Sequence, residues 1–188
     1  MNETKEKVYM PFIEGQLVSL HPIVEAHFNL YCKWANSLEY RISSGYKFPQ
    51  TIEEIKKSFK PIEDRRIREE IHFEIRYKKE KKPIGLTGFN SINYYSRKGI
   101  LSMIFGEKLY KTEDIAIETN KLILNYGFEE LNLHKIVLNI LALDDFSIKI
   151  VETLGLIKEL TLKDEVYFQG KRIDLLKYFI LKRDWRNL

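Results

Sequence analysis

The stretch that decides the fold is residues 126–136, which read YGFEELNLHKI. It joins two segments with different periodicity. Upstream, apolar positions recur at helical spacing and predict a helix from about residue 113 to residue 130, with one side formed by Ile115, Thr119, Leu122, Ile123 and Tyr126. Downstream, residues 135–141 are apolar and rich in β-branched side chains, which predicts a buried strand. The sequence therefore predicts a long helix that leads directly into a core strand.

The segments on either side extend this pattern. Residues 71–77 alternate apolar and polar side chains as a half-buried strand should. Two further strands are expected at 84–92 and 99–105, with turns at 79–82 and 94–98, and these three strands predict an antiparallel meander. A short strand at 17–20 and helices at 25–34 and from Thr51 precede the meander. After residue 141 we expect a helix over 145–154, closed by Gly155 in a left-handed conformation, and strands at 157–162 and 173–181.

This order predicts an α/β (mixed α+β) fold. We expect a central mixed, mostly antiparallel sheet of about seven strands, with helices on both faces. No repeat, linker or low-complexity tract interrupts the 188 residues, so a single domain over 1–188 is expected.

Composition excludes several classes of protein. Hydrophobic residues make up 44% and charged residues 31% of the chain, as in globular domains. We find no apolar run of bilayer length and no apolar leader near the N-terminus, which predicts a cytoplasmic protein without a membrane partner. The single cysteine, Cys32, excludes an internal disulfide, and no paired Cys/His spacing predicts a metal site. The net charge of +4 is scattered, and its densest run, 78–82, falls in a predicted turn, so no nucleic-acid partner is expected.

The stretch at 126–136 closely resembles a signature of the GNAT superfamily of N-acetyltransferases, in the branch of RimJ/RimL type. Further motifs of that branch follow in the same order: Pro83-Ile84-Gly85, Phe105-Gly106-Glu107, Leu154-Gly155-Leu156, the hairpin pattern from Tyr167 to Asp174, and Asp184-Trp185. The resemblance covers roughly residues 16–185. It implies the acyl-CoA N-acyltransferase fold and makes a homodimer a reasonable expectation.

The resemblance also implies a function. Enzymes of this superfamily move an acetyl group from acetyl-CoA to a primary amine. The expected acceptor here is either the N-terminus of a peptide or a small amine. Their pantetheine arm lies between two splayed parallel strands, and the pyrophosphate sits on backbone N–H groups at the start of the next helix. The cofactor-binding residues that this implies are Ile104, Phe105, Lys111, Thr112, Glu113, Asp114, Ile115, Ala116, Asp144 and Ser147.

The predicted pyrophosphate loop departs from the family pattern. Family members carry glycines before the helix, whereas residues 111–116 read KTEDIA. Glu113 and Asp114 place carboxylates where the diphosphate would lie. At about 5 Å and an effective dielectric constant near 20, each such like-charge pair costs roughly 3 kcal/mol before screening, unless a nearby lysine (Lys108, Lys111 or Lys121) offsets it. In the alternative reading, Thr112 and the two acids cap a structural helix.

The catalytic positions are also altered. The family pattern N-x-x-S/A corresponds to residues 144–147, which makes Ser147 the predicted acid that protonates the leaving thiolate. The tyrosine that often does this in the family is replaced by Val151, and the common glutamate base by Ile100. Glu107, at the end of the cofactor strand, is the second predicted catalytic residue.

Other polar and aromatic groups have two readings. His72 and Glu74 share one face of a predicted strand and are expected to face solvent, with a role as substitute catalytic groups as the alternative. Four aromatic residues in the region that shapes the acceptor pocket of the family could form its wall or belong to the core: Trp34, Tyr40, Tyr46 and Phe48. The altered loop also leaves a rival hypothesis open, in which the chain is an inactive GNAT-fold pseudoenzyme that serves as a binding or assembly module.

Overall fold

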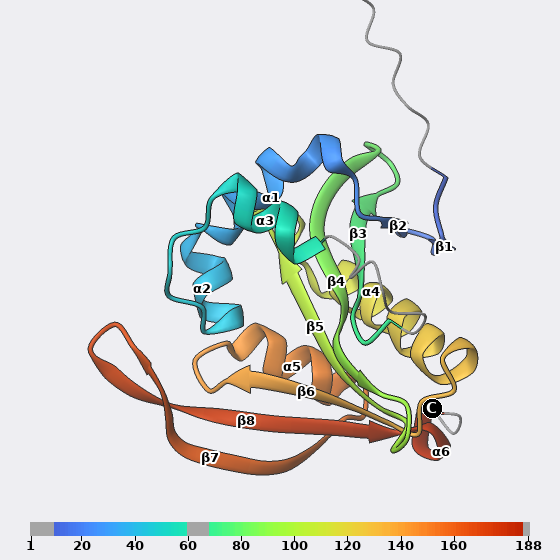
Figure 1. The fold of residues 1–188 in the computed structure, drawn as a ribbon. Helices are drawn as coiled ribbons and strands as arrows, with labels where there is room; N and C mark the ends of the chain where they lie inside the picture. The colour runs from blue at the N-terminus through green and yellow to red at the C-terminus, as the bar shows by residue number, and fades with distance from the viewer. Residues whose placement is uncertain (1–9, 60–67, 186–188) are drawn as a thin grey trace, which may run out of the picture.

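The computed structural model describes residues 10–59 and 68–185 (Figure 1). Its strands are β1 (Ile13–Glu14), β2 (Val18–Pro22), β3 (Ile71–Tyr77), β4 (Lys82–Asn93), β5 (Lys98–Phe105), β6 (Lys135–Leu141), β7 (Ile157–Phe168) and β8 (Lys171–Leu181). Its α-helices are α1 (Phe28–Ala35), α2 (Leu38–Ser44), α3 (Ile52–Phe59), α4 (Glu113–Asn125), α5 (Asp145–Thr153) and α6 (Lys182–Trp185). Short 3₁₀ turns, η1 (Glu25–His27) and η2 (Lys108–Tyr110), precede α1 and α4.

The strands of the described residues form one sheet in the order β1-β2-β3-β4-β5-β6-β8-β7. Strands β1 to β5 are antiparallel neighbours, β5 and β6 are parallel, and β8 is antiparallel to both β6 and β7. The predicted mixed, mostly antiparallel sheet is confirmed. It has one strand more than the seven expected, because the two-residue β1 carries too few residues for a periodic signal.

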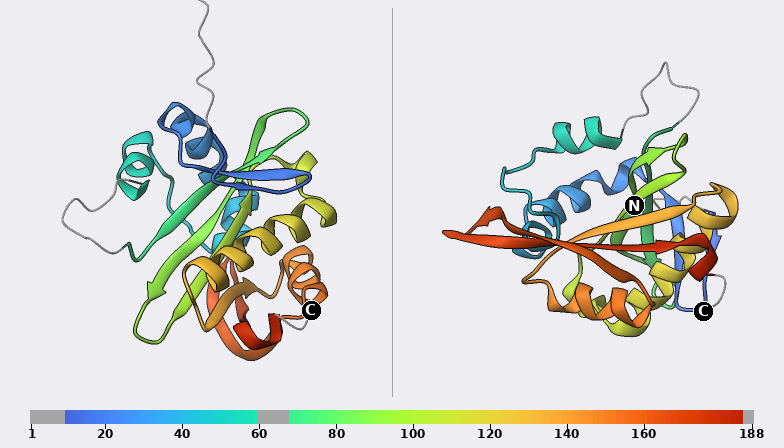
Figure 2. Two further views of the ribbon diagram at one scale, coloured as in Figure 1. Left: turned by 90° about the vertical axis from the view of Figure 1, so that its right-hand side faces the viewer. Right: turned by 90° about the horizontal axis from the view of Figure 1, so that it is seen from below.

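Helices cover both faces of this sheet, as predicted (Figure 2). Helices α4 and α5 lie on one face and α1, α2 and α3 on the other. The main core lies between the sheet and α4 and α5, where Ile75, Phe89, Ile123, Phe128 and Ile136 are fully buried. A smaller core under α1 and α3 contains Phe28, Tyr31, Trp34, Ala35 and Ile55.

The deciding stretch folds as its two periodicities predict. Helix α4 continues as a π-helical turn, η3 (Tyr126–Glu130), so the helical segment ends at residue 130 as expected. Asn132 then adopts a left-handed conformation (φ 52°), and β6 begins three residues later. A Cβ atom at Gly127 would lie 2.6 Å from Phe89 and 2.8 Å from Ile136. Only glycine therefore lets this turn pack so closely on the sheet.

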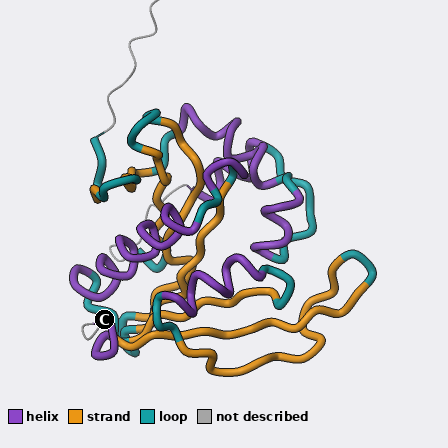
Figure 3. Tube along the Cα trace, turned by 180° about the vertical axis from the view of Figure 1, so that it is seen from behind, coloured by secondary structure: helices purple, strands orange, loops and turns teal. Residues whose placement is uncertain are grey.

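Two parts of the fold differ from the sequence-based expectation. The β7–β8 hairpin is longer than predicted and projects past the rest of the sheet (Figures 1 and 3). Its tight turn uses positive φ at Gln169 and Gly170, which matches the right-handed twist of a hairpin. Helix α2 was not predicted, although Ser37 caps its first turn and Gly45 ends it in a left-handed conformation. No helix in the ranges 10–59 and 68–185 is long and apolar enough to cross a membrane.

Candidate active site

The parallel strands β5 and β6 separate along most of their length. They pair only where Lys98–Ile100 faces Lys135–Val137, although β5 runs on to Phe105 and β6 to Leu141. The gap between the two arrows is visible in Figure 1. Within the described residues, the inner edge of β5 beyond Ile100 has no strand partner, so its backbone N–H and C=O groups can bind another molecule.

A cavity of about 500 Å³ opens at this separation. Its walls come from β5, β6 and β4, from the starts of α4 and α5, and from α2 and α3. Of the residues predicted to bind the cofactor, the cavity is lined by Ile104, Phe105, Lys111, Ala116, Asp144 and Ser147. The remaining four, Thr112, Glu113, Asp114 and Ile115, do not line it and form the first residues of α4 or its cap.

The start of α4 keeps its backbone donors available. Thr112 occupies the N-cap position, but its side chain makes no capping hydrogen bond. The first bond of the helix runs from the N–H of Ala116 to the carbonyl of Thr112, at 3.0 Å. The alternative reading therefore lacks the capping hydrogen bond expected from the Thr112 side chain, and the helix start retains the features that favour an anion.

The carboxylate of Glu113 has a cationic partner. It forms an ion pair with the ammonium of Lys149, which comes from α5. The expected repulsion between Glu113 and a diphosphate is thereby reduced, by a lysine that the sequence motifs did not indicate. Asp114 is exposed to solvent, so water screens its charge.

Asp144 is the centre of a polar network at the base of the cavity. It is 5% exposed and caps α5, accepting a hydrogen bond from the backbone N–H of Ser147 at 3.3 Å. Its Oδ2 also accepts from the hydroxyls of Ser147 (2.8 Å) and Ser43 (3.3 Å). Lys111 places its Nζ 3.4 Å from Oδ1. Asp144 thus connects α2, α5 and the segment before α4.

The predicted catalytic residues lie in different places. Ser147 lines the cavity, as do the apolar Ile100 and Val151 at the altered base and acid positions. Glu107 is not among the lining residues. Its carboxylate accepts from Trp34 Nε1 at 3.2 Å and lies 3.6 Å from Lys82 Nζ. These contacts are structural, and the geometry gives its predicted catalytic role no support.

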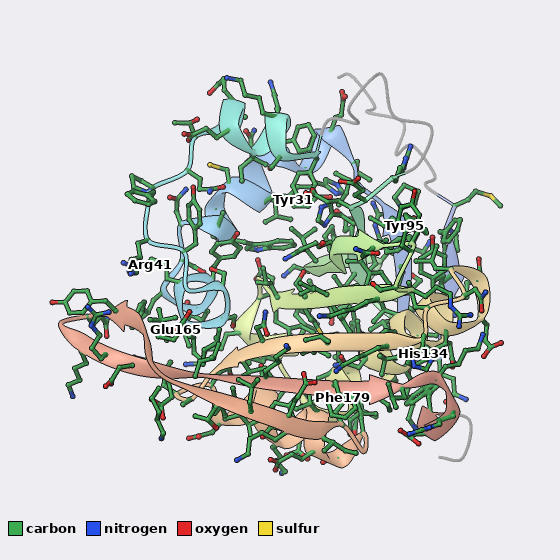
Figure 4. All side chains as sticks on the ribbon, turned by 60° about the horizontal axis from the view of Figure 1, so that its bottom comes forward. Tyr31, Arg41, Tyr95, His134, Glu165 and Phe179 are labelled. Carbon is green, nitrogen blue, oxygen red and sulfur yellow. The ribbon has the colours of Figure 1, made fainter. Side chains whose placement is uncertain are left out.

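The expectation that Glu74 and His72 face solvent is wrong. Glu74 is fully buried because α1 and η1 cover this part of β3. Its carboxylate accepts hydrogen bonds from the Tyr31 hydroxyl (2.6 Å) and Arg76 Nε (2.5 Å), and it lies 2.5 Å from His27 Nδ1. Figure 4 shows Tyr31 on the α1 side of the sheet. Burial, followed by the nearby charge of Glu74, raises the pKa of the Tyr31 hydroxyl.

His72 instead lines the cavity. It lies on β3, whereas Asp144 follows β6, and β4 and β5 come between these two strands in the sheet. Its ring packs edge-on against Phe59 of α3, with 5.4 Å between the ring centroids. Its Nε2 lies 3.5 Å from the Glu70 carboxylate. Burial lowers the pKa of His72, with Glu70 acting in the opposite direction. Strand alternation could not identify this residue as a site residue, because a covering helix turns an apparent solvent face into a cavity wall.

The aromatic residues of the N-terminal region divide between the two readings. Tyr40 lines the cavity, where burial raises the pKa of its hydroxyl. Trp34 belongs to the smaller core and packs over Gly106. Tyr46 and Phe48 are 40% and 72% exposed. Only Tyr40 therefore forms part of the cavity wall.

Comparison with known proteins identifies relatives among N-acetyltransferases. Residues 18–157 match the family described as acetyltransferase (GNAT) domain. The uncharacterized N-acetyltransferase p20 of Bacillus licheniformis is 29% identical over 113 residues, which are 60% of this chain and 63% of the relative. Spermidine N(1)-acetyltransferase of Vibrio cholerae is 28% identical over 108 residues, 57% of this chain and 62% of the relative. The matches thus span just under two thirds of these relatives.

Solved structures share the fold. The crystal structure of spermidine N-acetyltransferase from Vibrio cholerae in complex with CoA and spermine superposes with a TM-score of 0.83 at 22% identity, covering 92% of this chain and all of that one. The predicted superfamily is confirmed, whereas the RimJ/RimL branch, the homodimer and the cytoplasmic location stay predictions. Because the match over residues 18–157 spans well over half of the sequence, the chain belongs to the GNAT acetyltransferase domain family.

Proposed function

We propose that this protein transfers the acetyl group of acetyl-CoA to a primary amine of a small cationic molecule of the polyamine class. The observation that carries the proposal is the separation of β5 from β6, which exposes a strand edge beside a cavity of about 500 Å³. An extended chain with amide groups, such as pantetheine, can hydrogen-bond to such an edge.

Particular residues would hold the acyl donor. The edge of β5 around Ile104 and Phe105 binds the pantetheine arm. The backbone N–H groups of Glu113, Asp114 and Ile115, together with the ammonium of Lys111, bind the phosphates. The Glu113–Lys149 ion pair supports this assignment, because it draws one carboxylate toward α5.

The chemistry then rests on position and on proton transfer. The protein holds the amine next to the thioester, which converts a bimolecular encounter into a local reaction. The amine nitrogen attacks the carbonyl carbon, the C–S bond breaks, and the thiolate must receive a proton. We assign this transfer to Ser147, which lines the cavity beside Asp144: its hydroxyl gives a proton to the sulfur and takes the surplus proton of the acylated nitrogen, so that no alkoxide remains.

The acceptor class follows from charge and from the relatives. Glu39 of α2 and Glu70 line the cavity, and carboxylates there favour a cationic substrate. A relative and a structural neighbour from Vibrio cholerae are spermidine acetyltransferases by name. The N-terminus of a peptide, the other acceptor that the family resemblance implies, carries a single ammonium and gains less from two carboxylates.

Calorimetric titration with acetyl-CoA tests the donor, and thiol release from acetyl-CoA tests the acceptor. We expect micromolar binding, and faster turnover with spermidine than with an unmodified peptide. Ala116→Phe should abolish binding, because Ala116 lines the cavity and is 1% exposed. Lys121→Phe, which adds an aromatic ring on the exposed side of α4, is the matched control and should bind normally. No heat at millimolar acetyl-CoA from the folded wild-type protein would favour the pseudoenzyme.

A further inference from the structure

His72 on β3 is aligned with Ser102 on β5, the strand proposed to bind the cofactor, across the intervening strand β4. His72 of β3 pairs with Gly88 of β4, and Gly88 pairs with Ser102 of β5. Residues directly opposite one another on antiparallel strands point to the same face. Adjacent strands lie about 4.8 Å apart, so the Cα atoms of His72 and Ser102 are about 10 Å apart. His72 and Ser102 both line the cavity.

Glycine at the middle position keeps this span open. Gly88 has no side chain, so none rises from the sheet between the imidazole and Ser102. A larger residue is also excluded by the backbone, since a Cβ at Gly88 would lie 2.0 Å from the carbonyl oxygen of Ile71. The cavity-lining residues His72 and Ser102 are therefore separated by a position that carries no side chain.

The surroundings of His72 suit a proton acceptor. The Phe59 ring covers one side of the imidazole, whose side chain is 23% exposed. Desolvation disfavours the imidazolium and lowers the pKa of His72, which favours the neutral ring that can accept a proton. Glu70, 3.5 Å from Nε2, can accept a hydrogen bond from Nε2–H and leave Nδ1 as the basic atom.

We infer that His72 is the general base that deprotonates the acceptor amine. This inference rests on the proposed function. In the step, Nδ1 takes a proton from the ammonium, the freed lone pair forms the N–C bond to the thioester carbonyl, and the C–S bond breaks as the thiolate leaves. The other titratable groups lining the cavity are Glu39 and Tyr40 of α2, Glu70 before β3, and Lys111 and Asp144 at the phosphate end.

Three other candidates are excluded by their chemistry or their position. Ile100, at the family's usual base position, has no basic atom. Glu74 is on the same strand but is fully buried and accepts hydrogen bonds from Tyr31 and Arg76. Glu107 does not line the cavity. His72 is the histidine among the cavity-lining residues.

The test is the pH dependence of kcat/KM for spermidine in wild-type protein and in His72→Gln. In wild-type protein we expect kcat/KM to rise with pH through the lowered pKa of His72, since protonated His72 cannot accept a proton. His72→Gln should lower kcat/KM by about 100-fold or more and should lose this limb, while acetyl-CoA binding stays within twofold. His72→Ala should regain activity with added imidazole. His134→Gln, an exposed histidine at the start of β6, is the control and should match wild type (Figure 4).

The outcomes separate the two proposals. A His72→Gln variant with wild-type kcat/KM and an unchanged limb would overturn the inference and leave the proposed function intact. Loss of activity without a change in the pH limb, and without imidazole rescue, would assign His72 a positioning role and also overturn the inference. If the wild-type protein turns over no amine while binding acetyl-CoA, the proposed function fails first.

Discussion

The hydroxyl of Ser147 donates a 2.8 Å hydrogen bond to Oδ2 of Asp144. The proposed proton donor is therefore held by a buried carboxylate at a position where the family pattern has asparagine. Asp144 also contacts Lys111, which is proposed to bind the phosphates. One residue thus links proton transfer, donor binding and the start of α5.

Asp144→Asn should separate these roles. Asparagine caps a helix about as well as aspartate, so the free energy of unfolding should change little. Removal of the negative charge releases Lys111 for the phosphates, and we expect acetyl-CoA to bind about fivefold more tightly, which corresponds to roughly 1 kcal/mol. Asp144→Ala should instead destabilise the protein by about 1 kcal/mol through loss of the cap. Calorimetry and urea unfolding provide the two measurements, and weaker acetyl-CoA binding by Asp144→Asn would contradict this assignment.

The Glu113–Lys149 ion pair should control donor affinity through charge. Lys149→Gln leaves Glu113 uncompensated at the helix start and should weaken acetyl-CoA binding by up to about fivefold, whereas Glu113→Gln should tighten it. Both side chains are more than half exposed. The effects should therefore shrink at about 0.5 M salt, because salt screens exposed charges.

Lys163→Gln is the matched control for Lys149→Gln. It makes the same change in net charge and also breaks an exposed ion pair, with Asp174, on the β7–β8 hairpin away from the cavity. It should leave acetyl-CoA affinity unchanged. Equal weakening by both lysine variants would show that only the net charge matters.

The buried carboxylate of Glu74 should be a major source of stability. Glu74→Gln removes the charge that compensates Arg76, whose side chain is 13% exposed, and should cost about 3–5 kcal/mol of unfolding free energy. Tyr31→Phe removes one donor to this carboxylate and should cost about 1–3 kcal/mol. Glu159→Gln, which breaks partly exposed contacts with Lys135 and Lys177, should cost less than about 1 kcal/mol. Urea unfolding ranks the three, and a Glu74→Gln cost as small as that of Glu159→Gln would refute the prediction.

Gly127→Ala should destabilise the contact between η3 and the sheet. The added methyl group would lie 2.6 Å from Phe89 and 2.8 Å from Ile136, inside van der Waals contact, so we expect a loss of about 1–3 kcal/mol. Gly170→Asn, at a hairpin turn with no atom within 4 Å of a Cβ, should be nearly neutral because asparagine tolerates φ near +82°. Thermal unfolding of the two variants provides the comparison, and equal melting temperatures would argue against close packing at Gly127.

Local patterns were sufficient for the regular elements. The alternation of residues 71–77 and the apolar run of 135–141 correspond to β3 and β6 with the predicted bounds. The positive φ of Gly155 and the extent of the helical segment to residue 130 also agree with prediction. Helix α2 was not predicted because its seven residues are too few for a reliable periodic signal, although Ser37 and Gly45 lie at its ends.

The candidate site was predicted only in part. The motif order indicated the strand end at Ile104 and Phe105, and also Ser147, all of which line the cavity. It did not indicate Lys149 as the partner of Glu113, nor His72 as a cavity residue, because neither belongs to a family motif.

The sequence by itself determined most of the elements, their order and the family, since these depend on periodicity and on spacing along the chain. Only the tertiary structure decided which charged and polar side chains contact one another. Glu113 and Lys149 are 36 residues apart, Tyr31 and Glu74 43 residues apart, and Ser43 and Asp144 101 residues apart. Electrostatic and hydrogen-bond energies depend on distances in space and on burial, and both quantities are set by the packing of helices on the sheet rather than by any local stretch of residues.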